Sequence, residues 1–212
     1  SSANEMGGYL LHGGLDENGT YISPRTKIRW EAINGWADNL QKQGHPLLDS
    51  SVKLLKYGNY PNFEQAKYLL NLGEGKFLWD SLTITGVIEA RGRALAEIKA
   101  PDFQKITKED ISDTATGHMN KGLFVAHGFD EGGDPDSEKG AHDQMWFAAR
   151  DLLFGKDAYP KPEVPDSIGR PVEESDKSPL PIEYKGMIDL LMNVLMIEVR
   201  AESFFQYSMN VA

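Results

Sequence analysis

The chain of 212 residues contains no cysteine. This absence excludes disulfide bonds, thiolate metal ligands and cysteine nucleophiles, and it fits a reducing compartment, so we expect a cytoplasmic protein. No uninterrupted apolar run approaches the ~20 residues that a membrane helix needs. The opening SSANEMGGYLLHGG also lacks the positive and apolar regions of a signal peptide. We therefore expect no membrane as a partner.

Basic residues are few as well. Lys and Arg number 22 against 32 Asp and Glu, which gives a formal net charge of −10, and no basic stripe stands out. Such a chain repels phosphate backbones, so we expect no nucleic acid as a partner. It also lacks a G-x-S-x-G elbow, a P-loop and a dinucleotide-binding G-x-G-x-x-G. A hydrolase that uses His118 or His142 as a general base would have no identifiable nucleophile.

The composition is that of a globular protein. Hydrophobic residues make up 40%, aromatic residues 10% and charged residues 25% of the chain. The length favours a single domain over residues 1–212. Residues 1–22 are glycine-rich and predict an arm or small hairpin with a turn at Asn18-Gly19. Residues 156–181 hold six of the eleven prolines and predict a long loop before the last helix.

The spacing of apolar residues predicts an all-α protein between these segments. Asn62 is an expected N-cap with Gln65 three residues on, and Thr107 and Gly128 are expected to cap and end a later helix. The predicted helices cover residues 24–43, 62–72, 76–99, 107–127, 141–154 and 182–209.

Metal-ligand side chains interrupt the apolar faces of the last four predicted helices. Burying an ionised carboxylate alone costs several kcal/mol, so carboxylates on apolar faces call for a compensating cation or shared protons. Carboxylate and imidazole ligands without sulfur suit iron, manganese or zinc. We therefore predict a site for one or two such ions. Its predicted ligands are Glu89, His118, His142, Glu198 and Glu202.

Each of these residues also has a simpler interpretation. Glu198 and Glu202 could form a solvated face with Arg200 nearby, and Glu89 could pair with a neighbouring arginine. Either histidine could be an ordinary core or helix-end residue. His127 is expected at a helix end, where the helix dipole favours a cation, so we leave it out of the ligand set. Asp113 is a reserve ligand, and residues 130–138 are expected to be a solvated acidic loop.

The five predicted ligands on four helices resemble the ferritin-like di-metal carboxylate bundles. That superfamily takes a glutamate from each of two helices and a Glu-x-x-His motif from each of the other two. The resemblance covers residues 63–210 and implies a four-helix bundle with redox or oxygen chemistry at one or two metal ions. This sequence departs from the pattern because it contains no Glu-x-x-His.

Two functional hypotheses follow. The first is a ferritin-like metal-binding protein, in its enzymatic form an oxidoreductase that acts on a small molecule the sequence does not identify. The second is a non-catalytic helical interaction protein in which the same polar residues form a buried network without metal. We expect a homodimer, because Met187, Met192 and Met196 give the last helix an adaptable apolar face.

Overall fold

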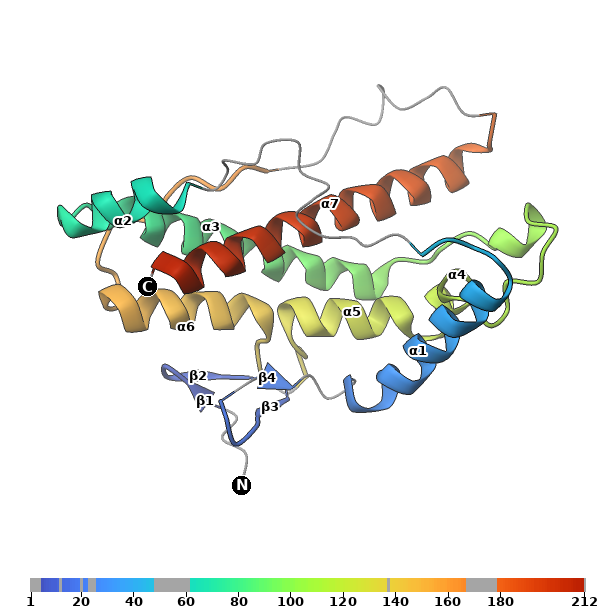
Figure 1. Ribbon diagram of the computed structural model, residues 1–212, viewed down its shortest axis with the longest axis horizontal. Coiled ribbons are helices and arrows are strands. Elements are labelled where there is room, and N and C mark those ends of the chain that lie inside the picture. The colour runs from blue at the N-terminus through green and yellow to red at the C-terminus, as the bar shows by residue number, and fades with distance from the viewer. Residues whose placement is uncertain are drawn as a thin grey trace. The chain divides into compact units, whose positions relative to one another are not determined.

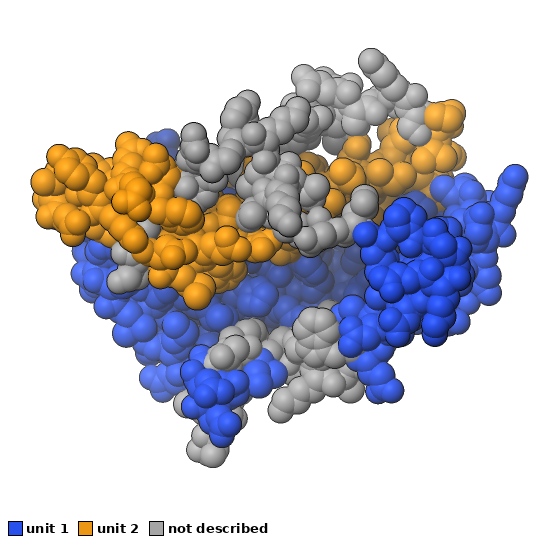
Figure 2. Space-filling view, in the orientation of Figure 1, with its two compact units in different colours: residues 1–47, 76–164 blue, residues 48–75, 165–212 orange. Residues whose placement is uncertain are grey.

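The computed structural model describes residues 5–11, 13–19, 21–22, 26–47, 62–136, 138–166 and 179–211. The chain divides into two compact units (Figure 2). Unit 1 holds residues 1–47 and 76–164, and unit 2 holds residues 48–75 and 165–212. The single domain over residues 1–212 and the bundle core over 63–210 stay predictions.

The protein is predominantly helical, which confirms the predicted all-α class. The α-helices are α1 (Thr26–Lys42), α2 (Phe63–Asn71), α3 (Lys76–Gly92), α4 (Ala115–His118), α5 (Leu123–Gly132), α6 (His142–Phe154) and α7 (Ile182–Val211) (Figure 1). Short 3-10 helices are η2 (Arg93–Glu97), η3 (Phe103–Lys105) and η4 (Met119–Lys121). As predicted, Asn62 caps α2 by accepting a hydrogen bond from the Gln65 backbone N–H, at 3.0 Å.

The predicted hairpin with its turn at Asn18-Gly19 is confirmed, and a second small antiparallel hairpin precedes it. Strand β1 (Glu5–Met6) pairs with β2 (Tyr9–Leu10), and β3 (Gly14–Leu15) pairs with β4 (Tyr21–Ile22). Gly7 and Gly8 form the first turn with φ of 56° and 85°, the pattern of a two-residue turn that glycine favours. The predicted turn at Asn18-Gly19 lies between β3 and β4, where the Gly19 N–H donates to the Asp16 carbonyl at 3.1 Å.

The predicted helix over residues 107–127 is wrong. Thr107 donates its hydroxyl to the Phe103 carbonyl and caps no helix, whereas Thr114 caps the single turn of α4 by accepting from the Gly117 N–H. Gly122 then adopts a left-handed φ of 106°, which separates this turn from α5. The expected stop at Gly128 also fails, because α5 runs on to Gly132.

Packing explains the glycines inside α5. A Cβ at Gly128 would lie 2.7 Å from the Ala96 backbone N, and one at Gly132 would lie 3.0 Å from the Ala90 carbonyl oxygen. Both glycines therefore let α5 approach η2 and the end of α3 closely. The predicted helix over residues 76–99 likewise ends earlier than expected, since α3 stops at Gly92 and a 3-10 turn follows.

The core of unit 1 forms where α5 and α6 pack against α3. In Figure 1, α5 and α6 follow one another in one row, so the end of α5 meets the start of α6. Gly86 on α3 makes room for the Phe147 ring on α6, since a Cβ there would lie 2.5 Å from its Cε1 atom. Arg150 lies buried between the helices and donates from Nη1 to the Thr83 hydroxyl at 3.2 Å.

Unit 2 consists of α2 and α7 among its described residues. The Phe63 ring of α2 stacks on Tyr207 of α7 with ring centroids 5.7 Å apart. Helix α7 confirms the predicted last helix. Of the predicted proline-rich loop, residues 156–166 contain no helix or strand and residues 179–181 lead into α7, while residues 167–178 lie outside the described part of the chain.

Candidate metal centre

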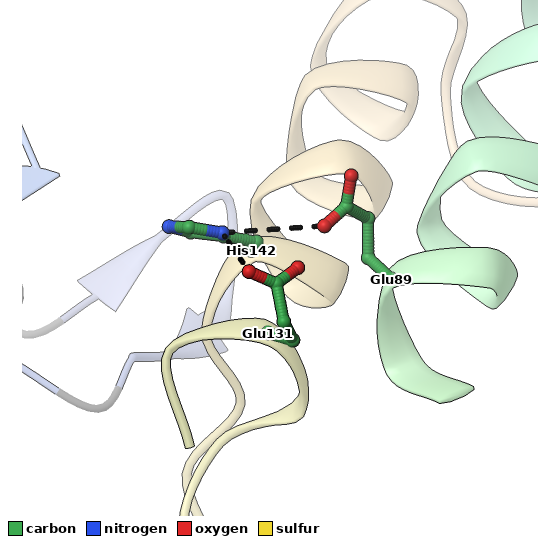
Figure 3. A group of neighbouring side chains, drawn as sticks. All are labelled: Glu89, Glu131 and His142. Carbon is green, nitrogen blue, oxygen red and sulfur yellow. Dashed lines mark ion pairs between the residues drawn. The ribbon is translucent and has the colours of Figure 1, made fainter. Parts of the chain in front are cut away.

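Three side chains with metal-ligand atoms meet where the end of α5 reaches the start of α6. Glu89 comes from α3, Glu131 from the last turn of α5 and His142 from the first position of α6. Their ligand atoms lie within 4.8 Å of one another, and Figure 3 shows the imidazole facing both carboxylates. The three helices all belong to unit 1, so the whole group lies within one compact unit.

The distances are short enough for direct electrostatic contact. His142 Nδ1 lies 3.4 Å from Glu131 Oε1 and 4.0 Å from Glu89 Oε2. The glutamates are 8% and 7% exposed, while the His142 side chain is 34% exposed. The two carboxylates are therefore removed from water, and the imidazole gives the group its contact with solvent.

Gly92 makes room for Glu131 beside α3. It lies three residues after Glu89, and a Cβ at this position would come within 2.9 Å of Glu131 Cβ and Cγ. Residues three apart share a helix face, so the missing side chain allows the second carboxylate to lie next to the first. The close approach of α5 to α3 is thus part of how the group is built.

A tight loop returns the chain from Glu131 to His142. Gly133 ends α5 with a φ of 77°, and a Cβ there would lie 1.9 Å from the Lys139 carbonyl oxygen, a position only glycine can hold. The Asp134 N–H donates to that same carbonyl at 3.0 Å. At the start of α6, Asp143 accepts a hydrogen bond from the Ala141 N–H at 2.8 Å, and burial raises the pKa of Asp143.

The neighbours of Glu131 favour its ionised form. Burial alone would raise the pKa of Glu131, but hydrogen bonds with His142 and Glu89 and the charges of His142 and His127 outweigh burial and lower the pKa to about 2. Glu131 is therefore a carboxylate at neutral pH. A buried carboxylate of this kind needs positive charge nearby.

His127 contributes to this environment, contrary to the sequence prediction. It lies inside α5 and not at a helix end, one turn before Glu131, and its Nε2 is 3.5 Å from Glu131 Oε1. Two imidazoles therefore approach the same carboxylate oxygen. Glu131 itself was missed, because the glycines that follow it favoured an acidic loop over residues 130–138. Residues four apart on a helix are neighbours, so a predicted helix that continued through Gly128 would have placed His127 beside Glu131.

The predicted ligands are distributed unevenly. Glu89 and His142 are brought together, whereas His118 lies at the end of α4, with its Nδ1 2.9 Å from the Thr114 carbonyl and its ring 5.1 Å from that of Trp36. Glu198 and Glu202 lie on α7 in unit 2, where the Gln206 amide donates to Glu202 at 3.3 Å. Their contribution to a metal site stays a prediction. The reserve ligand Asp113 is exposed, ahead of α4.

The distances from His142 to Glu89 and to Glu131 are compatible with a shared first-row divalent metal ion. Two ligands that each lie ~2.1 Å from an ion are ~3.4 Å apart at a tetrahedral angle and ~4.2 Å apart when they face each other across it. The observed 3.4 and 4.0 Å fall within this range. Two oxygen donors and one nitrogen donor suit iron, manganese or zinc.

Comparison with protein-family models, with curated proteins and with solved structures finds no match for this chain. The resemblance to ferritin-like bundles is therefore neither supported nor opposed by a relative. In the described part of the chain, no helix combines the length and the apolar character that crossing a membrane requires.

Proposed function

We propose that this protein binds a divalent ion of iron, manganese or zinc through Glu89, Glu131 and His142. The observation that carries the proposal is the convergence of two buried carboxylates and one imidazole, from three helices, within 4.8 Å. Side chains of this kind are rarely buried together unless they are paired or bind a metal.

Charge balance supports the proposal. An ion of charge +2 would offset two buried carboxylates with His142 neutral, the form in which imidazole binds metals. Without an ion, the two buried carboxyl groups need positive charge from His127 and His142 or a proton shared between Glu89 and Glu131.

The ligand set also supports a reactive site. Three protein ligands leave at least one coordination position for water or a substrate, which is the arrangement of catalytic metal sites. The His142 side chain is 34% exposed, so solvent reaches the edge of the site. A ferritin-like bundle and redox or oxygen chemistry on a small molecule form the finer part of this proposal. For such chemistry iron or manganese is the metal of choice, because zinc has no redox activity.

A second candidate function rests on the hydrogen bonds themselves. Glu131 interacts with both His142 and Glu89, so the three residues could serve as a polar network that fixes the register of α3, α5 and α6. The protein would then be a metal-free, homodimeric interaction protein. Metal content separates the two candidates.

Elemental analysis of protein purified without chelators or metal-affinity steps tests the proposal. We expect about one equivalent of metal in the wild type, and its loss in Glu131→Gln, which keeps the shape of the side chain but removes its charge. Glu97→Gln is the matched control, because Glu97 is an exposed glutamate of the same unit on η2. Metal that persists in Glu131→Gln, or a wild type that takes up none after incubation with each of the three ions, would overturn the proposal.

A further inference from the structure

The hairpin of residues 5–11, called here the N-terminal hairpin, is attached to the chain on both sides of His142. On the C-terminal side of His142, within α6, the Tyr9 hydroxyl donates to Asp151 Oδ2 at 2.7 Å. On the N-terminal side of His142, just before α6 begins, the Gly140 N–H donates to the Leu10 carbonyl at 3.2 Å. Leu11 also pairs with Gly140 in a parallel β-bridge. His142 lies between these two attachments.

Both attachments are well packed. The Leu11 side chain is 0% exposed, as is Ala141 directly before His142. At the turn of the hairpin, Gly7 approaches α6 so closely that a Cβ there would lie 3.3 Å from Ala148 Cβ. The N-terminal hairpin therefore lies along α6 and is held by apolar burial as well as by hydrogen bonds.

The Asp151 attachment is itself anchored in the core. Arg150 Nε donates to Asp151 Oδ1 at 2.7 Å, while Arg150 Nη1 reaches Thr83 on α3. Burial raises the pKa of the Tyr9 hydroxyl, and its hydrogen bond to Asp151 raises it further, so Tyr9 remains a donor at neutral pH. A chain of contacts thus joins the N-terminal hairpin through α6 to α3, the helix that carries Glu89.

We propose that the N-terminal hairpin positions His142 and thereby sets the affinity of the centre for a divalent ion. This inference rests on the proposed metal-binding function. Movement at Gly140 shifts the first residue of α6, and with it the imidazole, relative to Glu89 and Glu131. Groups that orient a metal ligand commonly change metal affinity by ~10- to 100-fold when they are removed. Because coupling between sites is reciprocal, a bound ion should also hold the hairpin more firmly on α6.

The test compares Leu11→Ala and Tyr9→Phe with Met119→Ala, a matched control. Met119 is a buried side chain of similar size in the same unit, on η4. The dissociation constants of Zn²⁺ and Mn²⁺ are measured by calorimetry for each folded variant. We expect Leu11→Ala to weaken binding by at least ~10-fold and Tyr9→Phe to weaken it by a smaller factor, with Met119→Ala close to the wild type. Equal affinities in wild type, Leu11→Ala and Tyr9→Phe would overturn the inference.

Hydrogen exchange gives a second readout, and its comparison of variants needs no metal. Leu11→Ala should speed amide exchange over residues 139–146 more than Met119→Ala does, and Zn²⁺ should slow exchange over residues 5–11 in the wild type. If the wild type binds no ion but Leu11→Ala still loosens residues 139–146, the metal proposal fails and the positioning of His142 stands. If exchange over residues 139–146 is the same in Leu11→Ala and Met119→Ala, the positioning of His142 is refuted.

Discussion

Replacement of Glu131 by glutamine should destabilise the metal-free protein in a pH-dependent way. The pKa of Glu131 is about 2 in the folded protein against an ordinary value of 4.5. One pKa unit corresponds to ~1.4 kcal/mol, so the full shift corresponds to ~3 kcal/mol of stability. Glutamine retains part of the hydrogen bonding, and we therefore expect Glu131→Gln to lower the free energy of unfolding by ~1–3 kcal/mol at about pH 6.

The sign of the pH dependence follows from the lowered pKa. A carboxyl group with a folded pKa below its unfolded value stabilises the protein fully above the unfolded pKa. That stabilisation is lost as pH falls from 4.5 toward about 2. The difference in unfolding free energy between wild type and Glu131→Gln should therefore be fully present above about pH 5 and shrink as the pH falls toward about 2.

Urea unfolding of chelator-treated protein, followed by circular dichroism at several pH values, measures this difference. Glu97→Gln is again the control, and its unfolding should follow that of the wild type throughout. Equal stability of wild type and Glu131→Gln in mildly acidic solution, or a difference that grows as the pH falls below about 4, would refute the reasoning.

Three further substitutions test the packing and capping. Gly86→Ala should cost ~1–3 kcal/mol in urea unfolding, because its Cβ would lie 2.5 Å from the Phe147 ring; unchanged stability would show that α3 and α6 are further apart. Gly92→Ala should reduce metal content by displacing Glu131, which elemental analysis measures, and full metal content would contradict that contact. Thr114→Ala should cost ~1 kcal/mol through the lost cap of α4, as its midpoint of urea unfolding would show, and an unchanged midpoint would contradict that cap.

Local signals in the sequence were enough to predict several elements. Asn62 with Gln65 marked the start of α2, and Gly155 marked the end of α6, because capping involves only residues close in the chain. The fourth predicted helix failed because its cap was placed at Thr107, whereas Thr114 is the cap in the structure and Gly122 breaks the segment with a left-handed φ.

The candidate site was predicted in part for a related reason. Glu89 and His142 interrupt apolar helix faces, so periodicity alone identified them. Glu131 depends on Gly128 and Gly132 being inside a helix, where they allow close packing against η2 and α3. Glycine is normally a helix-ending signal, and only long-range contacts reverse that interpretation.

Anomalous X-ray diffraction at the metal absorption edge would test the central claim most directly. Crystals grown with Zn²⁺ or Mn²⁺ should show one anomalous peak ~2.0–2.2 Å from a carboxylate oxygen of Glu89, a carboxylate oxygen of Glu131 and Nδ1 of His142. A peak bound only by other residues, or no peak in crystals that contain excess metal, would contradict the account.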